Sequence, residues 1–126
     1  MPSNPVGWFE IYVDDMDRAE SFYASILKVN FEKLGDPTDS NVTMLAFPSN
    51  MEAYGASGAL VKMEGMKAGG NSTLIYFACD DCSIEESRIV KSGGQILQEK
   101  MAIGEYGFIA LAQDTEGNMF GLHSQK

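Results

Sequence analysis

The sequence contains few of the residues that most often bind metals or act as nucleophiles. Its 126 residues include one histidine, His123, and two cysteines, Cys79 and Cys82. The C-x-x-C spacing of the cysteines is typical of a redox dithiol or of half a zinc site. A zinc site needs two further ligands, and a single histidine cannot supply both.

Basic residues and long apolar runs are scarce as well. Nine Lys and Arg against 18 Asp and Glu give a formal net charge of −9, which repels phosphate backbones, so we expect no nucleic-acid partner. No apolar run approaches the ~20 residues that span a bilayer, so we expect no membrane partner. The opening segment MPSNPVGW lacks the basic and apolar regions of a signal peptide, which favours a cytoplasmic location.

The chain does have the size and composition of one globular domain, with 44% apolar and 21% charged residues. Its clearest pattern is the stretch 8–23, which predicts a strand that runs into an amphipathic helix. In this strand Trp8, Glu10 and Tyr12 alternate with apolar side chains and therefore share one face. That face carries a lone carboxylate between two aromatic rings.

The same pattern occurs a second time, 66 residues further along the chain. Four identities fall in matching strand–turn–helix patterns at this offset: Asp14 with Asp80, Asp15 with Asp81, Glu20 with Glu86, and Ser21 with Ser87. We interpret the chain as two copies of one supersecondary unit. The offset also pairs Cys79 with Val13 and Cys82 with Met16, both apolar, so core packing is favoured over redox chemistry for the cysteines.

The two copies and the segment between them account for most of the chain. Module one is predicted to span about residues 6–63, the linker residues 64–72, and module two about residues 73–123. Because neither module alone closes a core, we expect residues 1–126 to form a single α+β domain.

Each module is predicted to contain a strand, a helix and three further strands. The two helices are predicted to begin at the N-caps Asp17 and Ser83, each followed by a glutamate three residues later. The further strands are predicted at residues 31–34, 41–47 and 58–63 in module one, and at 95–101, 108–112 and 118–123 in module two.

These features resemble the vicinal oxygen chelate superfamily, which contains glyoxalase I, extradiol dioxygenases, fosfomycin resistance enzymes and bleomycin resistance proteins. The matching stretches, from first to last, are EIYVDDMDRAESFY, YFACDD, KSGGQI and DTEGNMFGL. The resemblance implies two βαβββ modules that form one half-open barrel around a cavity for a small molecule. It also implies a homodimer.

The resemblance further implies where a metal ion would bind, at the first and last strands of each module. The corresponding positions are Trp8 and Leu74 on the first strands, and Gly121 and Gly58 or a neighbour on the last strands. None of these side chains offers the oxygen or nitrogen donors that a divalent ion needs. We therefore expect no metal ligands and no cofactor.

The same resemblance directs one face of the first and last strands towards the cavity. The residues expected to bind a ligand are Trp8, Glu10, Tyr12, Leu74, Tyr76, Met119, Gly121 and His123. Glu10 is the candidate catalytic residue, because a carboxylate enclosed by aromatic rings can act as a general base. Alternatively, Glu10 binds Tyr76 or a backbone amide and only orients the barrel. His123 can pair with Glu10 or a ligand, but a surface position at a strand end is favoured.

Two functions from different classes follow from this pattern. In the first, the protein binds a cationic or aromatic small molecule, as in the bleomycin resistance branch of the family. In the second, it is a glyoxalase-like lyase or isomerase that uses Glu10 as acid and base. The missing metal ligands favour the first function, and whether the protein is an enzyme stays open at this point.

Overall fold

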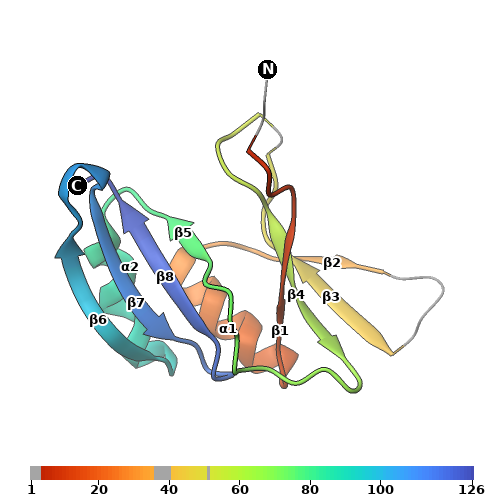
Figure 1. Ribbon diagram of the computed structural model, residues 1–126. Coiled ribbons are helices and arrows are strands. Elements are labelled where there is room, and N and C mark those ends of the chain that lie inside the picture. Colours follow the sequence, from red (N-terminus) through yellow and green to blue (C-terminus); the bar gives the residue numbers. More distant parts are fainter. Residues whose placement is uncertain (1–3, 36–40, 51) are drawn as a thin grey trace.

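The computed structural model describes residues 4–35, 41–50 and 52–126, which form two four-stranded sheets and two principal helices (Figure 1). The first module contains β1 (Phe9–Tyr12), α1 (Met16–Leu27), β2 (Glu32–Leu34), β3 (Val42–Ala46) and β4 (Gly58–Met63). The second contains β5 (Tyr76–Ala78), α2 (Cys82–Ile89), η1 (Val90–Ser92), β6 (Gln95–Ala102), η2 (Gly104–Tyr106), β7 (Phe108–Gln113) and β8 (Met119–Ser124). The predicted α+β class and the repeated order of a strand, a helix and three strands are confirmed.

The two sheets have the same topology. Their strand orders are β1-β4-β3-β2 and β5-β8-β7-β6, and in each sheet the first and last strands of the module pair in parallel. The other neighbours are antiparallel. In the described part of the chain β1 and β5 are edge strands, so the sheets do not close into a barrel. The repeat in the sequence is therefore a repeat in space, with an opening between its two halves.

Each principal helix begins earlier than predicted. The observed N-caps are Asp15 and Asp81, whose carboxylates accept hydrogen bonds from the backbone N–H groups of Arg18 (3.1 Å) and Ser83 (3.0 Å). The predicted caps, Asp17 and Ser83, lie within the first turn instead, so this prediction was wrong. Starting at these earlier positions allows each helix to bury its first residue, which is apolar.

A cluster of aromatic rings joins the two modules through α1. Tyr23, which is fully buried, has its ring centroid 5.9 Å from Phe47 of module one. The same ring lies 5.8 Å from Phe77 and 5.6 Å from Phe120 of module two. Such ring pairs stabilise a fold beyond the area that they bury. One helix of the first module therefore packs into a core that both sheets share.

The two cysteines are part of this core, as the repeat predicts. Cys82 is fully buried, and Cys79 packs against the cluster of buried residues. Burial, followed by the negative charge of Glu85, raises the pKa of the Cys79 thiol to about 12. Thiolate is the reactive form, so neither cysteine has the environment of a redox dithiol.

None of the described helices combines the length and the apolar character that crossing a membrane requires.

We expect neither cysteine of the folded protein to react with iodoacetamide at neutral pH, because one thiol is inaccessible and the other stays protonated. Mass spectrometry should find both residues alkylated only after denaturation. Rapid modification of native Cys79 would contradict the structure.

Candidate functional site

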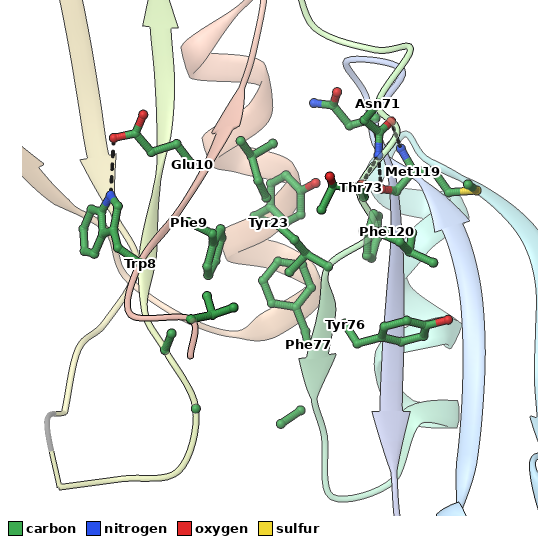
Figure 2. Close-up of a pocket in the computed structure, with 18 of the residues that line it drawn as sticks. Trp8, Phe9, Glu10, Tyr23, Asn71, Thr73, Tyr76, Phe77, Met119 and Phe120 are labelled. Atoms are coloured by element: carbon green, nitrogen blue, oxygen red, sulfur yellow. Dashed lines mark hydrogen bonds between the residues drawn. The ribbon is translucent and has the colours of Figure 1, made fainter. Parts of the chain in front are cut away.

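A cavity of about 1040 Å³ lies between the two modules, along β1 and β5 (Figure 2). Its walls come from β1, from the segment that leads into β5, from the start of β8, and from the loop before β4. Six of the residues predicted to bind a ligand line this cavity: Trp8, Glu10, Tyr12, Leu74, Tyr76 and Met119. A cavity of this size can enclose a drug-sized molecule.

Large apolar side chains are left exposed in the walls of this cavity. Trp8 is 45% exposed, Tyr76 44% and Met119 37%. Their neighbours along the strands, Phe9 and Phe77, pack against the core and also line the cavity. The alternation that the sequence shows thus separates exposed side chains from side chains that pack against the core, and side chains of both kinds line the cavity.

The Glu10 carboxylate is exposed, and it is held by two aromatic residues of its own strand. The indole N–H of Trp8 donates to Glu10 Oε2 (3.3 Å), and the Tyr12 hydroxyl donates to Glu10 Oε1 (2.9 Å). The hydrogen bond to Glu10 raises the pKa of Tyr12, and burial of the phenol raises it further to a smaller extent. The Tyr12 hydroxyl therefore remains a donor at neutral pH. The expectation that aromatic rings desolvate Glu10 was wrong, because they flank the carboxylate without covering it.

Gly121 and His123 do not line the cavity, although the pattern had directed them towards it. A Cβ atom at Gly121 would collide with the Tyr76 ring, which lies over the glycine. His123 Nε2 lies 2.7 Å from the carbonyl oxygen of Tyr106 at the other end of the sheet. The strand-end position that we favoured for His123 is the one observed.

The register of the sheets identifies the fourth position of the family's metal site. In the second sheet, Gly121 of β8 pairs with Tyr76 of β5. The residue equivalent to Tyr76 in the repeat is Glu10 of β1, and Glu10 pairs with Ala59 of β4. The position left open near Gly58 is therefore Ala59, which is fully buried. Neither alanine nor glycine can bind a metal ion.

The residues present do not fit the metal ion that the resemblance implies. The two remaining positions hold Trp8, whose indole nitrogen is a donor only, and Leu74. In the described ranges no group of three or more His, Cys, Asp or Glu side chains is arranged to hold a metal ion. Chemistry at this site would thus depend on the side chains of the cavity walls.

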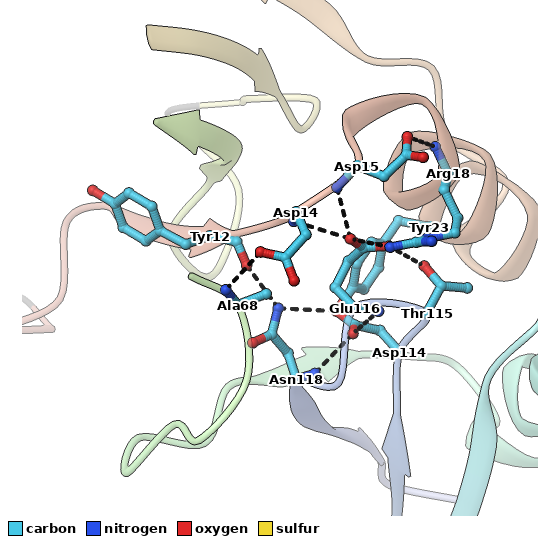
Figure 3. Close-up of polar contacts among 10 residues, drawn as sticks. All are labelled: Tyr12, Asp14, Asp15, Arg18, Tyr23, Ala68, Asp114, Thr115, Glu116 and Asn118. Atoms are coloured by element: carbon cyan, nitrogen blue, oxygen red, sulfur yellow. Dashed lines mark hydrogen bonds and ion pairs between the residues drawn. The ribbon is translucent and has the colours of Figure 1, made fainter. Parts of the chain in front are cut away.

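A polar network that we did not predict adjoins the cavity at Asn118 (Figure 3). It is built from Asp114, Glu116 and Asn118, three buried residues of the β7–β8 turn. Asn118 donates to the carbonyl oxygen of Tyr12 at the end of β1 (2.9 Å) and accepts from the N–H of Gly69 in the linker (2.7 Å). The turn of module two therefore holds two segments that border the cavity.

Asp114 is the centre of this network. Its Oδ1 accepts from the backbone N–H groups of Glu116 (2.8 Å) and Asn118 (2.9 Å), and its Oδ2 accepts from the Tyr23 hydroxyl (2.6 Å). Burial raises the pKa of Asp114 in spite of these donors. Burial and the nearby Asp114 raise the pKa of Tyr23 well above its usual value, so its hydroxyl remains a donor.

Glu116 links the same turn to the start of α1. It forms a bidentate pair with Arg18, at 2.6 Å to Nε and 2.9 Å to Nη2, and it accepts from the N–H groups of Asp14 (3.0 Å) and Asp15 (2.8 Å). Burial opposes ionisation, but the hydrogen bonds from Arg18 and from these backbone groups outweigh it and lower the pKa of Glu116 to about 2. Glu116 therefore remains charged at neutral pH.

The chain shares this architecture with known proteins. The family model for the Glyoxalase/Bleomycin resistance protein/Dioxygenase superfamily matches residues 6–122. A protein of Mycobacterium tuberculosis named "Putative glyoxylase CFP32" is 27% identical over 116 residues, which are 91% of this chain and 42% of that protein. The chain thus spans less than half the length of the curated relatives that it matches.

Solved structures with the same fold include both enzymes and binding proteins. Glyoxalase I from Zea mays superposes with a TM-score of 0.73 at 26% identity, covering 93% of this chain and 43% of the maize chain. TnmS3, an antibiotic binding protein from Streptomyces sp. CB03234, superposes with a TM-score of 0.66 at 23% identity, covering 100% and 99%. The family match extends over nearly the whole chain, and the chain belongs to the glyoxalase/bleomycin resistance protein/dioxygenase superfamily.

Proposed function

We propose that the protein binds a small molecule in the cavity between its two modules, without the metal ion of its catalytic relatives. The observation that carries this proposal is the 1040 Å³ cavity, in which exposed aromatic rings stand beside a fixed carboxylate. Trp8 and Tyr76 can stack on a planar group, and Glu10 can accept hydrogen bonds from a cationic one. The best ligand class is therefore an aromatic molecule that carries a positive charge.

The charge of the protein supports this choice of ligand. A formal net charge of −9 favours the approach of cations and disfavours anionic metabolites. The shared fold with an antibiotic binding protein is consistent with a role in sequestering a toxic compound. We further propose that the protein is a homodimer and is located in the cytoplasm. Light scattering of the purified protein would measure how many subunits it contains in solution.

A second candidate function is a lyase or isomerase reaction with Glu10 as acid and base. It is favoured by the position of Glu10 in the cavity, where Trp8 and Tyr12 fix both carboxylate oxygens. A general base has to be held within hydrogen-bonding distance of the proton that it removes. The mycobacterial relatives named as putative glyoxylases also support this alternative.

Trp8, the single tryptophan of the chain, provides a direct test because it lines the cavity. We expect a screen of cationic aromatic compounds to find ligands that change its fluorescence. At about 100 times its Kd, such a ligand should raise the free energy of unfolding by ~2.7 kcal/mol. Binding should persist in EDTA. A broad screen without any ligand that affects both Trp8 fluorescence and thermal stability would overturn the proposal.

Glu10→Gln distinguishes the two candidate functions. If the protein binds a cation, the variant should weaken that ligand by about tenfold, which corresponds to ~1.4 kcal/mol. If the protein is an enzyme, the variant should abolish turnover of a substrate that it still binds. Unchanged affinity for the cation would contradict the first function, and unchanged turnover would contradict the second.

A further inference from the structure

A second, smaller cavity lies beyond the aromatic residues that border the first one. Its volume is about 250 Å³, and it shares Phe9 and Phe77 with the larger cavity. These rings come from β1 and β5 and meet edge to face, with centroids 6.2 Å apart (Figure 2). The remaining walls include the end of α1, the segment before β4, and α2.

The side chains that line the smaller cavity are apolar except for two. The apolar members include Phe9, Phe47, Phe77 and Leu27, and the polar members are Ser57 and Glu85. The Ser57 hydroxyl donates to the carbonyl oxygens of Phe47 (3.2 Å) and Pro48 (2.9 Å). Glu85 is thus the single ionisable side chain among the lining residues.

The Glu85 carboxylate is incompletely satisfied by the protein. Its Oε1 is buried and has no hydrogen-bond partner of ordinary geometry within the described ranges, and the one donor that interacts with the carboxylate is the weakly polar thiol of Cys79. The ion pairs of these ranges are Arg18 with Glu116 and Lys100 with Asp81, so no basic side chain neutralises Glu85. An unpartnered buried carboxylate oxygen is costly, because it has lost water without gaining a donor. A ligand that supplies a cationic N–H donor would remove that cost once a rotation of the side chain turns the carboxylate towards the cavity.

We propose that the smaller cavity is a binding site for a compact primary amine with an apolar body, in which the ammonium group pairs with Glu85. The phenylalanine rings suit this ligand in two ways. They can pack against its apolar body, and their faces can attract its positive charge. The small volume selects a single ring or a short branched chain over the larger molecules that the main cavity accommodates. This site does not depend on the ligand of the main cavity.

Benzylamine and benzyl alcohol are a matched pair of probes, since they have similar shapes and differ in charge at neutral pH. In a titration followed by ¹H–¹⁵N correlation spectra, we expect benzylamine to shift the amide signals of Leu27, Val29, Ser57 and Glu85. Benzyl alcohol should bind at least ~10 times more weakly. Equal binding of both probes would overturn the proposal, as would the absence of benzylamine binding up to roughly 20 mM.

Three variants assign the effect to Glu85. Glu85→Gln, whose spectrum reports whether it folds, should weaken benzylamine by at least ~10-fold. Glu105→Gln removes one negative charge at an exposed position of η2 and should leave the affinity unchanged. Glu10→Gln should leave unchanged the affinity that is measured from the amide signals of Leu27, Val29, Ser57 and Glu85, even where it weakens benzylamine in the main cavity. Shifts at Trp8 and Leu74 with none at the four amides of the smaller cavity, or a loss of affinity at those four amides in Glu10→Gln and not in Glu85→Gln, would overturn the proposal while leaving the proposed function intact.

Discussion

Asp114→Ala is expected to lower the free energy of unfolding by about 3–5 kcal/mol. The change removes both acceptor oxygens at the centre of the polar network, and it leaves the fully buried Tyr23 without a partner for its hydroxyl. The N–H groups of Glu116 and Asn118 lose their acceptor as well. A domain is stable by only about 5–15 kcal/mol in total, so equilibrium unfolding in urea would show this loss clearly.

Two conservative variants divide this effect into its parts. Asp114→Asn keeps one oxygen that can accept from the backbone N–H groups, but it places an amide nitrogen opposite the Tyr23 hydroxyl and the Asn118 side-chain amide. We expect this variant to lose about 1–3 kcal/mol of the free energy of unfolding. Tyr23→Phe removes only the buried hydroxyl and should cost about 1–2 kcal/mol. If Asp114→Ala unfolded at the same urea concentration as the unsubstituted protein, the network would have no stabilising role.

The same network connects stability with the shape of the main cavity. Asn118, which Asp114 positions, holds the end of β1 through Tyr12 and the linker through Gly69. Tyr12 is also a donor to Glu10 in the cavity wall. Loss of the Asp114 carboxylate therefore removes a constraint on the strand that carries the candidate site. The fold and the site depend on the same turn.

The architecture could be predicted because its signals are local and occur twice. Alternation along residues 8–13 identifies the two faces of β1, and the offset of 66 residues repeats the strand and helix in module two. The N-caps were misplaced for a local reason. Asp15 and Asp17 both satisfy the composition of a cap, and only the burial of Met16 in the core decides between them.

The polar network was missed because its partners are far apart in the sequence. Tyr23 and Asp114 are separated by 91 residues, and Asn118 and Tyr12 by 106. From the sequence, the segment 114–118 has the composition of an exposed turn. The one local signal is that polar residues occupy every second position of this segment, as they would on one face of a strand. Packing of module two against module one turns that face inward.

The candidate site was predicted more completely on β1 than on β8. Alternation placed Trp8, Glu10 and Tyr12 on one face, the family resemblance directed that face towards the cavity, and all three line it. On β8 the same rule failed beyond Met119, since the Tyr76 ring from the neighbouring strand lies over Gly121. Alternation predicts which face a side chain shares, but it does not predict which neighbour covers that face.

Glu116→Gln is expected to lower the free energy of unfolding by roughly 3 kcal/mol at neutral pH. The Glu116 side chain is fully buried, and its pKa falls from an ordinary 4.5 to about 2 in the folded protein. The neutral glutamine cannot form the charged pair with Arg18, and its amide offers one acceptor oxygen where the carboxylate offers two. Arg18→Gln should cost less, because three of the donors to Glu116 remain.

The effect of Glu116→Gln should depend on pH in a defined direction. A carboxyl group whose pKa is lower in the folded state stabilises the fold above its unfolded pKa, and this contribution disappears as the pH falls towards the folded pKa. The difference between the two proteins should therefore be largest above about pH 5 and should shrink progressively towards about pH 2. Asp114, whose pKa is raised, has the opposite dependence, but it is present in both proteins and cancels in the comparison. Urea unfolding across this range would reveal the convergence, whereas a constant difference would show that Glu116 acts by packing and neutral hydrogen bonds alone.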